Sequence, residues 1–377
     1  FTTEQVSSRL KGEPGSKVKV TVEHLDGSTE TVTLQRERIS IPGVPYTGWV
    51  ADGIGYIKLG QFARTTSAEM EQALASLRAE GVTKLIFDLR GNSGGYLDQA
   101  ILVANEFLHK DQLIVYTEDR QHKQLREYAD GTGAAQDMDV VVLIDEGSAS
   151  SSEILAGALQ DNDRGTIVGR RSFGKGLVQR QFPLQDGSAV RLTVARYHTP
   201  TGRMIQRPYE NGNLDAYYED FNKRFEPGAS DSVGGDTTQR FKTLHSGRTV
   251  YGGGGITPDI VVPLDTSDYT KYWGSLVRQG VINEFVIEYL DENRPALSSR
   301  YAAPEKFVSD FTVSDDVLDA LTAKATKKGI AFDAAEFERS KKALKTQLKA
   351  LIAQKMWGVN EYSLVVNGED DPVFAKA

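Results

Sequence analysis

Two short motifs combine residue types that could perform nucleophilic catalysis. The first is GSASSSE at residues 147–153, and the second is SFGKGLVQ at residues 172–179. A serine hydroxyl attacks a carbonyl carbon once a base has removed its proton, and a neutral lysine amine can serve as that base. We therefore take Ser150 as a candidate nucleophile and Lys175, 25 residues further along the chain, as its candidate base.

The residues around Ser150 predict a strand, a turn and a helix. The apolar run Val140–Ile144 is typical of a buried strand, Gly147 marks a turn, and apolar residues then recur at helical spacing. A serine at such a turn lies beside free N–H groups and the positive helix end, which can stabilise an oxyanion. A simpler interpretation is that Ser150 and Glu153 form only a Ser-x-x-Glu capping box.

Glycines flank Lys175 on both sides, and the lysine is predicted to open a strand. Because side chains alternate along a strand, Lys175, Leu177 and Gln179 would share one face. Partial burial of that face would desolvate the amine and favour its neutral, basic form, and Gln179 could orient it. Taken alone, Lys175 is better explained as a solvated turn lysine.

Together, the two motifs resemble the carboxy-terminal processing (tail-specific) peptidases, a family of serine peptidases with a Ser–Lys dyad. The separation of 25 residues and the Lys-x-x-x-Gln step both fit this family. The resemblance implies that Ser150 is the nucleophile, Lys175 the general base and Gln179 the residue that positions Lys175. It implies no metal and no cofactor.

Several alternatives remain open at this site. The family often has alanine at the position of Ser151, so the chain carries a serine cluster in which Ser148 and Ser152 are weaker candidate nucleophiles. His198 is an alternative base, at a position where the family more often has an aromatic residue. A serine–histidine pair would, however, leave Lys175 without a role.

A glycine-rich stretch, DLRGNSGG at residues 88–95, is a second point of resemblance. It matches neither common phosphate-binding motif, and a tight turn is its simplest interpretation. The family has a similar Asp-Leu-Arg-x-Asn-x-Gly-Gly element. This implies an oxyanion hole made by the N–H of Gly94 or Gly95 together with the N–H of Ser151. The sequence does not distinguish between the two glycines.

Alternating strand and helix patterns from residue 54 onward predict an α/β core of parallel βαβ units. Catalytic groups of such sheets lie at the carboxyl ends of the strands, so the Ser150 turn and the loop 91–95 are expected to face each other. The resemblance implies a crotonase/ClpP-like core. A capping box at residues 66–69 is expected to open one of the helices. The predicted strands are Ile54–Leu59, Lys84–Leu89, Leu113–Tyr116 and Val140–Ile144.

The chain is expected to have three regions. Residues 1–38, a short helix and a hairpin, resemble the C-terminal half of a PDZ domain, in which Val6 and Leu10 would contact a peptide. Residues 39–263 form the catalytic core. Residues 264–377 form a helical region with a good N-cap at Asp333, and its role as a packing, homo-oligomer or adaptor surface is open.

Composition limits the function classes. The 377 residues, 39% hydrophobic and 25% charged, are typical of a globular chain, and the net charge of −8 argues against a nucleic-acid partner. No apolar run approaches the roughly 20 residues of a membrane-spanning helix. The absence of cysteine excludes disulfides, thiolate catalysis and cysteine-ligated zinc. We expect the other half of the PDZ-like domain, with any targeting segment, to precede Phe1.

The sequence therefore predicts a serine endopeptidase that recognises apolar C-terminal tails of protein substrates. Such peptidases work in the bacterial periplasm or envelope or outside the cell, a location implied by the resemblance alone. The first alternative is a catalytically silent PDZ-type peptide-binding or scaffold protein on the same fold. The second is an acyl-CoA enzyme of the crotonase type, for which the sequence shows no basic cluster.

Overall fold

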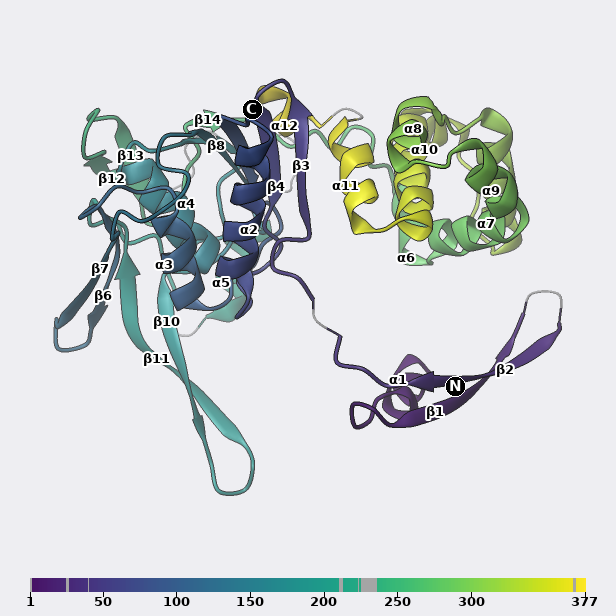
Figure 1. The fold of residues 1–377 in the computed structure, drawn as a ribbon, viewed down its shortest axis with the longest axis horizontal. Helices are drawn as coiled ribbons and strands as arrows, with labels where there is room; N and C mark the ends of the chain where they lie inside the picture. The colour runs from purple at the N-terminus through teal and green to yellow at the C-terminus, as the bar shows by residue number, and fades with distance from the viewer. Residues whose placement is uncertain are drawn as a thin grey trace. The chain divides into compact units, whose positions relative to one another are not determined.

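The structure of the protein is a computed structural model that describes residues 2–24, 27–39, 41–209, 213–222, 224, 236–368 and 371–377. Contacts divide the chain into two compact units, Phe1–Ile41 and Pro42–Ala377. Figure 1 gives the element labels used here.

The first unit contains the predicted helix and hairpin. Helix α1 (Thr3–Leu10) begins after a capping box in which Thr2 and Gln5 hydrogen bond reciprocally. Strands β1 (Lys17–Glu23) and β2 (Thr29–Gln35) pair antiparallel. Helix α1 buries none of its residues, and both side chains expected to contact a peptide, Val6 and Leu10, are exposed.

A six-stranded sheet forms the centre of the second unit, with the order β14-β9-β8-β5-β4-β3. All neighbouring strands are parallel except β3 and β4. The predicted α/β class is confirmed, as are the strands predicted at 54–59, 84–89 and 140–144. The strands are β3 (Tyr46–Ala51), β4 (Ile54–Lys58), β5 (Lys84–Asp88), β8 (Asp139–Ile144), β9 (Thr166–Gly169) and β14 (Ile260–Val261).

The two faces of this sheet bury different clusters. Helices α2 (Thr66–Ala79), α3 (Leu97–Asn105) and α4 (Ser151–Asp161) cover one face and form the main core, with α3 next to both α2 and α4 (Figure 1). The opposite face buries a smaller cluster that includes Tyr56 and Val373. Alternate residues of the buried strands therefore supply both cores.

The capping box predicted at residues 66–69 is wrong. Thr66 is the first helical residue of α2 and Thr65 is the N-cap. The Thr66 hydroxyl instead accepts from the N–H of Ala63 at 2.9 Å and donates to the carbonyl of Gln61 at 3.1 Å. The preceding turn uses the hydroxyl, so it is not available to cap the helix.

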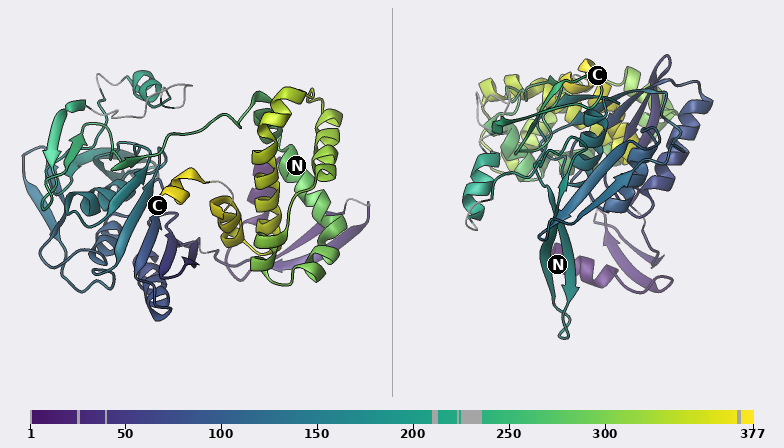
Figure 2. Two further views of the ribbon diagram at one scale, coloured as in Figure 1. Left: turned by 90° about the horizontal axis from the view of Figure 1, so that it is seen from above. Right: turned by 90° about the vertical axis from the view of Figure 1, so that its left-hand side faces the viewer.

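The strand predicted near Leu113 exists, but it does not join the parallel sheet. It pairs antiparallel with β7 and β11 in a four-stranded sheet of order β10-β11-β6-β7. The β10–β11 hairpin extends well beyond the rest of the core, as the views in Figures 1 and 2 agree. These strands are β6 (Leu113–Asp119), β7 (Gln124–Tyr128), β10 (Leu177–Pro183) and β11 (Ala189–His198).

The predicted helical region is confirmed and has its own hydrophobic cluster. Helix α10 (Ala334–Met356) begins at the predicted N-cap Asp333, whose carboxylate accepts from the N–H of Glu336 at 2.9 Å. No helix among the described residues is long and apolar enough to span a membrane. The other helices here are α6 (Lys271–Arg278), α7 (Val281–Arg300), α8 (Pro304–Asp310), α9 (Asp315–Lys327), α11 (Val359–Gly368) and α12 (Pro372–Lys376). In sequence, α5 (Leu214–Asn222), β12 (Asp236–Lys242) and β13 (Thr249–Gly252) lie between β11 and β14.

Candidate active site

Ser150 lies at the turn between β8 and α4, at the carboxyl end of a central strand. It is the N-cap of α4, and it forms the predicted capping box with Glu153, whose carboxylate accepts from the N–H of Ser150 at 2.8 Å. Its backbone angles are φ 56° and ψ −113°. A positive φ is rare for a residue with a side chain and costs free energy, so the surrounding turn must impose it.

The neighbouring serines use their hydroxyl groups in backbone hydrogen bonds. Ser148 and Ser152 are fully buried, and their hydroxyls donate to the carbonyls of Leu89 and Asn92, each at 2.8 Å. Among the residues that the structure describes, no acceptor takes the hydroxyl proton of Ser150. Ser148 and Ser152, the weaker candidates, are therefore engaged in holding the turn.

Ser151 is likewise engaged. It is buried, and its hydroxyl donates to the carbonyl of Gly95 at 3.1 Å. Its N–H, in the first turn of α4, has no acceptor within the described parts of the chain, as is usual for the first N–H groups of a helix. That N–H is thus available to a bound group.

The loop 90–95 faces the Ser150 turn, as expected from the parallel sheet. A Cβ atom added to Gly94 would lie 2.9 Å from the Cβ of Ser150 and 2.7 Å from the carbonyl oxygen of Ala149. The N–H of Gly94 donates to the side-chain oxygen of Asn92 at 2.9 Å. No acceptor for the N–H of Gly95 is found among the described residues, so Gly95 has the free donor of the pair.

A cavity of about 470 Å³ brings the predicted residues together. Lys175, half-buried, lines it with Ser150 and Gln179. Lys175 does not open a strand as predicted, because β10 begins at Leu177. The segment from Ser172 to Lys175 is instead held by backbone and side-chain contacts to other elements. The remaining lining residues are Gly95, Tyr96, Leu97, Ser151, Ile154, Leu177, Val178, Gln181, Arg191 and Tyr197.

No hydrogen bond joins the side chains of Ser150, Lys175 and Gln179 to one another within the described structure. Gln179 is exposed, on the strand that follows Lys175. Hydrogen bonds between catalytic groups are often long before substrate binds, so the absence of such bonds does not exclude these residues. What supports them is that they line the same cavity. The three side chains have that placement.

Glu153 links the two predicted motifs, a role that the sequence did not reveal. Besides the N–H of Ser150, its buried carboxylate accepts from the N–H groups of Gly174 at 2.7 Å and Lys175 at 2.9 Å, and from the Ser172 hydroxyl at 2.5 Å. Burial raises the pKa of Glu153, and these hydrogen bonds oppose that shift. The capping-box pattern identified Glu153, but not its contacts 19 to 22 residues away.

Tyr197 forms a second link. Its hydroxyl donates to the carbonyl oxygens of Lys175 and Ser150, the latter at 3.2 Å. The side chain is buried, and burial, with the nearby Glu153 charge, raises the pKa of Tyr197 well above its ordinary value. Tyr197 is therefore a neutral donor that fixes both backbone segments.

His198, the alternative base, does not line the cavity. Its ring stacks on Tyr116 with centroids 4.7 Å apart, and its Nδ1 lies 3.2 Å from the carbonyl oxygen of Gly202. Asp161, at the end of α4, forms a buried ion pair with Arg203 and accepts from the Thr201 hydroxyl at 2.7 Å. These contacts brace the core beside the cavity.

Two stretches of the chain match known protein families. Residues 53–211 match the model described as peptidase family S41, and residues 272–358 match a family of unknown function, DUF8443. A carboxyl-terminal-processing protease of Synechocystis sp. is 42% identical over 215 residues, which cover 55% of this chain and 49% of that protein. A chloroplastic C-terminal processing peptidase of Tetradesmus obliquus is 37% identical over 217 residues, covering 54% and 46%.

A solved photosystem II D1 C-terminal processing protease is similar at 37% identity and a TM-score of 0.41, covering 55% of this chain and 57% of that one. The chain thus spans about half the length of the curated relatives it matches. The matched stretch contains the Ser150 turn, Lys175 and the loop 90–95. Residues 53–211 thus match peptidase family S41, and over about half of its length the chain is similar to the carboxyl-terminal-processing proteases.

Proposed function

We propose that the protein is a serine endopeptidase of the C-terminal processing type, with Ser150 as nucleophile and Lys175 as general base. One observation carries the proposal: Ser150 sits in a strained turn and lines a cavity with Lys175, while the neighbouring serine hydroxyls are bound to the backbone. Strain held at one residue by its surroundings is typical of functional sites. The match of residues 53–211 to peptidase family S41 supports the same reaction.

In the proposed mechanism, the neutral amine of Lys175 accepts the proton from the Ser150 hydroxyl as its oxygen bonds to the peptide carbonyl carbon. The tetrahedral intermediate then breaks the C–N bond, and Lys175 returns the proton to the leaving amine. Water hydrolyses the resulting acyl-enzyme by the same route in reverse. Gln179, at the edge of the cavity, is proposed to orient the Lys175 amine.

We propose Gly95, rather than Gly94, as the oxyanion donor that acts with the N–H of Ser151. The Gly94 N–H already has an acceptor in Asn92, whereas a free N–H can strengthen its interaction as negative charge develops. Both proposed donors belong to residues that line the cavity. Within the described structure, neither N–H group has to break a hydrogen bond before it can bind the oxyanion.

Substrate is proposed to bind in extended form along β10. This strand lies at the edge of its sheet, and four of its residues line the cavity: Leu177, Val178, Gln179 and Gln181. An edge strand offers unpaired backbone groups to an added strand. Such a substrate has to be unfolded at the cleavage point, as the C-terminal tail of a protein is.

Tail recognition through the PDZ-like first unit, with Val6 and Leu10 as contacts for apolar tails, remains part of the proposal. An envelope or secreted location also remains a prediction, which cell fractionation tests. The helical region would then supply contacts to a second copy or an adaptor. Tail recognition, location and partner contacts are proposed for the whole protein, and they have a role only if it cleaves peptides.

The decisive experiment measures cleavage of an unfolded protein with an apolar C-terminus by the full-length protein and its Ser150→Ala and Lys175→Ala variants. We expect each substitution to lower kcat by at least about 1,000-fold while the folded structure persists. A fluorophosphonate should label the wild type and leave Ser150→Ala unlabelled. Ser309→Ala and Lys306→Ala, exposed on α8, are matched controls that should retain full activity.

Two outcomes would change the assignment. Full activity of Lys175→Ala would remove Lys175 as the base and make His198 the next candidate to substitute. A wild type that neither cleaves nor reacts with fluorophosphonate, yet binds tail peptides, would favour the silent peptide-binding alternative.

A further inference from the structure

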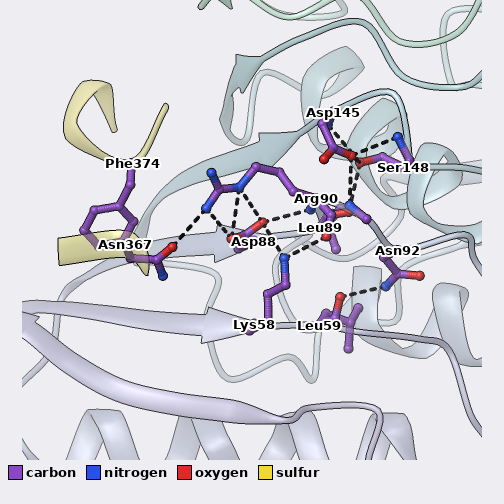
Figure 3. A network of polar contacts seen from close by, with 12 residues as sticks. Lys58, Leu59, Asp88, Leu89, Arg90, Asn92, Asp145, Ser148, Asn367 and Phe374 are labelled. Atoms are coloured by element: carbon purple, nitrogen blue, oxygen red, sulfur yellow. Dashed lines mark hydrogen bonds and ion pairs between the residues drawn. The ribbon is translucent and has the colours of Figure 1, made fainter. Parts of the chain in front are cut away.

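A cluster of buried charges lies at the carboxyl ends of β4 and β5, just before the active-site loop. Asp88 is 1% exposed and accepts from the Tyr56 hydroxyl at 2.7 Å and from the N–H of Arg90 at 2.8 Å. The ammonium group of Lys58 lies 3.1 Å from its carboxylate, and the Arg90 guanidinium makes a bond of 2.7 Å (Figure 3). Asp88 thus has two cationic partners, Lys58 at the end of the neighbouring strand β4 and Arg90 just after β5.

Arg90 has further partners from the far end of the sequence. Its guanidinium pairs with Asp371, 281 residues away, and donates to the side-chain oxygen of Asn367 at 3.3 Å. Figure 3 shows Arg90 extended between Asp88 on one side and Asn367 on the other. Arg90 therefore joins the end of β5 to Asn367 and Asp371 near the end of the chain.

Val373 and Phe374 pack on the sheet face that α2, α3 and α4 do not cover. Val373 is 2% exposed within the cluster of this face, and the Phe374 ring contacts Tyr56 edge-on with centroids 5.5 Å apart. Asp371 also caps α12, because its carboxylate accepts from the N–H groups of Val373 and Phe374 at 2.9 and 3.0 Å. One carboxylate thus holds both α12 and Arg90.

A series of hydrogen bonds connects the backbone near Arg90 to the turn that carries Ser150. The carbonyl of Arg90 accepts from Lys58 at 2.7 Å, and the next residue, Gly91, donates to Asp145 at 2.8 Å. The carbonyl of Asn92 accepts from the N–H of Ala149 at 2.9 Å, directly before Ser150. A displacement of Arg90 would therefore be transmitted to the loop and to the turn.

The attachment of these residues is local. A hollow of about 760 Å³ lies against Arg90 and Asp371, and aromatic residues of the helical region, Trp273 and Tyr362, line its other side. Packed side chains therefore do not fill the space beside Arg90 and Asp371. The Arg90–Asp371 pair, the Asn367 hydrogen bond and the packing of Val373 and Phe374 are contacts that hold this part of the chain to the sheet.

We propose that residues 367–368 and 371–374 act as a clamp that positions the active-site loop, and that engagement of Asp371 with Arg90 sets the turnover rate. The proposal rests on the proposed function, because the loop matters for catalysis only if Gly95 holds the oxyanion. Arg90 and Asp371 are positioning residues and do not touch substrate. The helical region, from which the clamp emerges, thereby gains a physical link to catalysis.

The test substitutes Asp371→Asn in the full chain. Asparagine is also a good N-cap, so α12 is retained while the charge opposite Arg90 is removed. We expect kcat for an internally quenched peptide to fall about tenfold with KM within about twofold, because misplaced catalytic groups lower turnover more than binding. Asp371→Glu should restore most of kcat. Asp315→Asn, which removes an exposed carboxylate paired with Lys341 and Lys345, is the matched control.

A second readout does not depend on activity. Amide hydrogen exchange of the peptide covering 89–97 should be faster in Asp371→Asn than in the wild type and unchanged in Asp315→Asn. Unchanged exchange in Asp371→Asn overturns the clamp, whatever the activity. An active wild type with equal kcat in Asp371→Asn also overturns it. A wild type without cleavage or fluorophosphonate labelling instead overturns the proposed function, and faster exchange would then still support the clamp as a structural link.

Discussion

The backbone N–H groups of Ser150 and Lys175 donate to the same oxygen atom, Oε2 of Glu153, at 2.8 and 2.9 Å. A single buried carboxylate therefore fixes the separation of the two segments that carry the proposed nucleophile and base. Its other oxygen accepts from Gly174 and Ser172. The Ser150–Lys175 arrangement thus depends on a residue that need not touch substrate.

Replacement of this carboxylate should disturb both stability and turnover. In Glu153→Gln, the side-chain NH2 group would face backbone donors, so we expect the free energy of unfolding to fall by about 2–4 kcal/mol. Urea unfolding measures this change, and peptide cleavage below the new midpoint should show a lower kcat. Glu80→Gln, at an exposed site, should change stability by less than about 0.5 kcal/mol. Wild-type stability and kcat in Glu153→Gln would contradict the linking role.

A side chain at Gly95 should abolish the proposed oxyanion hole. A Cβ atom there would lie 2.2 Å from the carbonyl oxygen of Phe62, so the backbone of Gly95→Ala must move and its N–H with it. We expect kcat to fall at least about 100-fold, the usual effect of losing one oxyanion donor. Gly91→Ala is the control, since Gly91 also has a positive φ but nothing lies within 4 Å of an added Cβ. Equal effects of the two substitutions would indicate backbone strain alone.

The strained backbone of Ser150 predicts that two inactive variants at this position differ in stability. Glycine adopts a positive φ without steric cost, whereas alanine retains the strain. We expect Ser150→Gly to be more stable than Ser150→Ala by about 1 kcal/mol in urea unfolding, while neither variant reacts with a fluorophosphonate. If Ser150→Gly is the less stable of the two, the turn is not strained in solution.

The charge cluster at Asp88 predicts a dependence of stability on pH. Burial on its own would raise the pKa of Asp88, but Lys58 and Arg90 outweigh it and lower the pKa from 3.8 to about 2. The folded chain therefore binds this proton more weakly than the unfolded chain. Ionised Asp88 contributes about 2 kcal/mol of stability above pH 4, which is lost as the pH falls through about 2.

The measurement compares unfolding of the wild type with that of Asp88→Asn from pH 6 down to pH 2. The stability difference between the two proteins should be largest at pH 6 and should narrow by about 2 kcal/mol at the acid end. A difference that stays constant across this range would show that the pKa of Asp88 is not lowered.

Local patterns predicted the elements that hold the site, because their cause lies within a few residues. The apolar run Val140–Ile144 became β8, and the Ser-x-x-Glu pattern became the start of α4 with its capping box. Asp333 caps α10 as predicted. The same reasoning failed at Thr66, because its hydroxyl forms hydrogen bonds with Ala63 and Gln61 of the preceding turn.

The sequence by itself determined the α/β core, the strand–turn–helix at Ser150 and the family resemblance, since periodicity, caps and motif spacing are properties of neighbouring residues. Tertiary structure decided that the hydroxyls of Ser148 and Ser152 donate to backbone carbonyls, that the Gly94 N–H donates to Asn92, and that Glu153 bridges the two motifs. It also placed β6 in the second sheet and Asp371 against Arg90. Hydrogen bonds and ion pairs between distant segments form only after the packed sheet has brought those segments together. A pattern of neighbouring residues therefore cannot predict them.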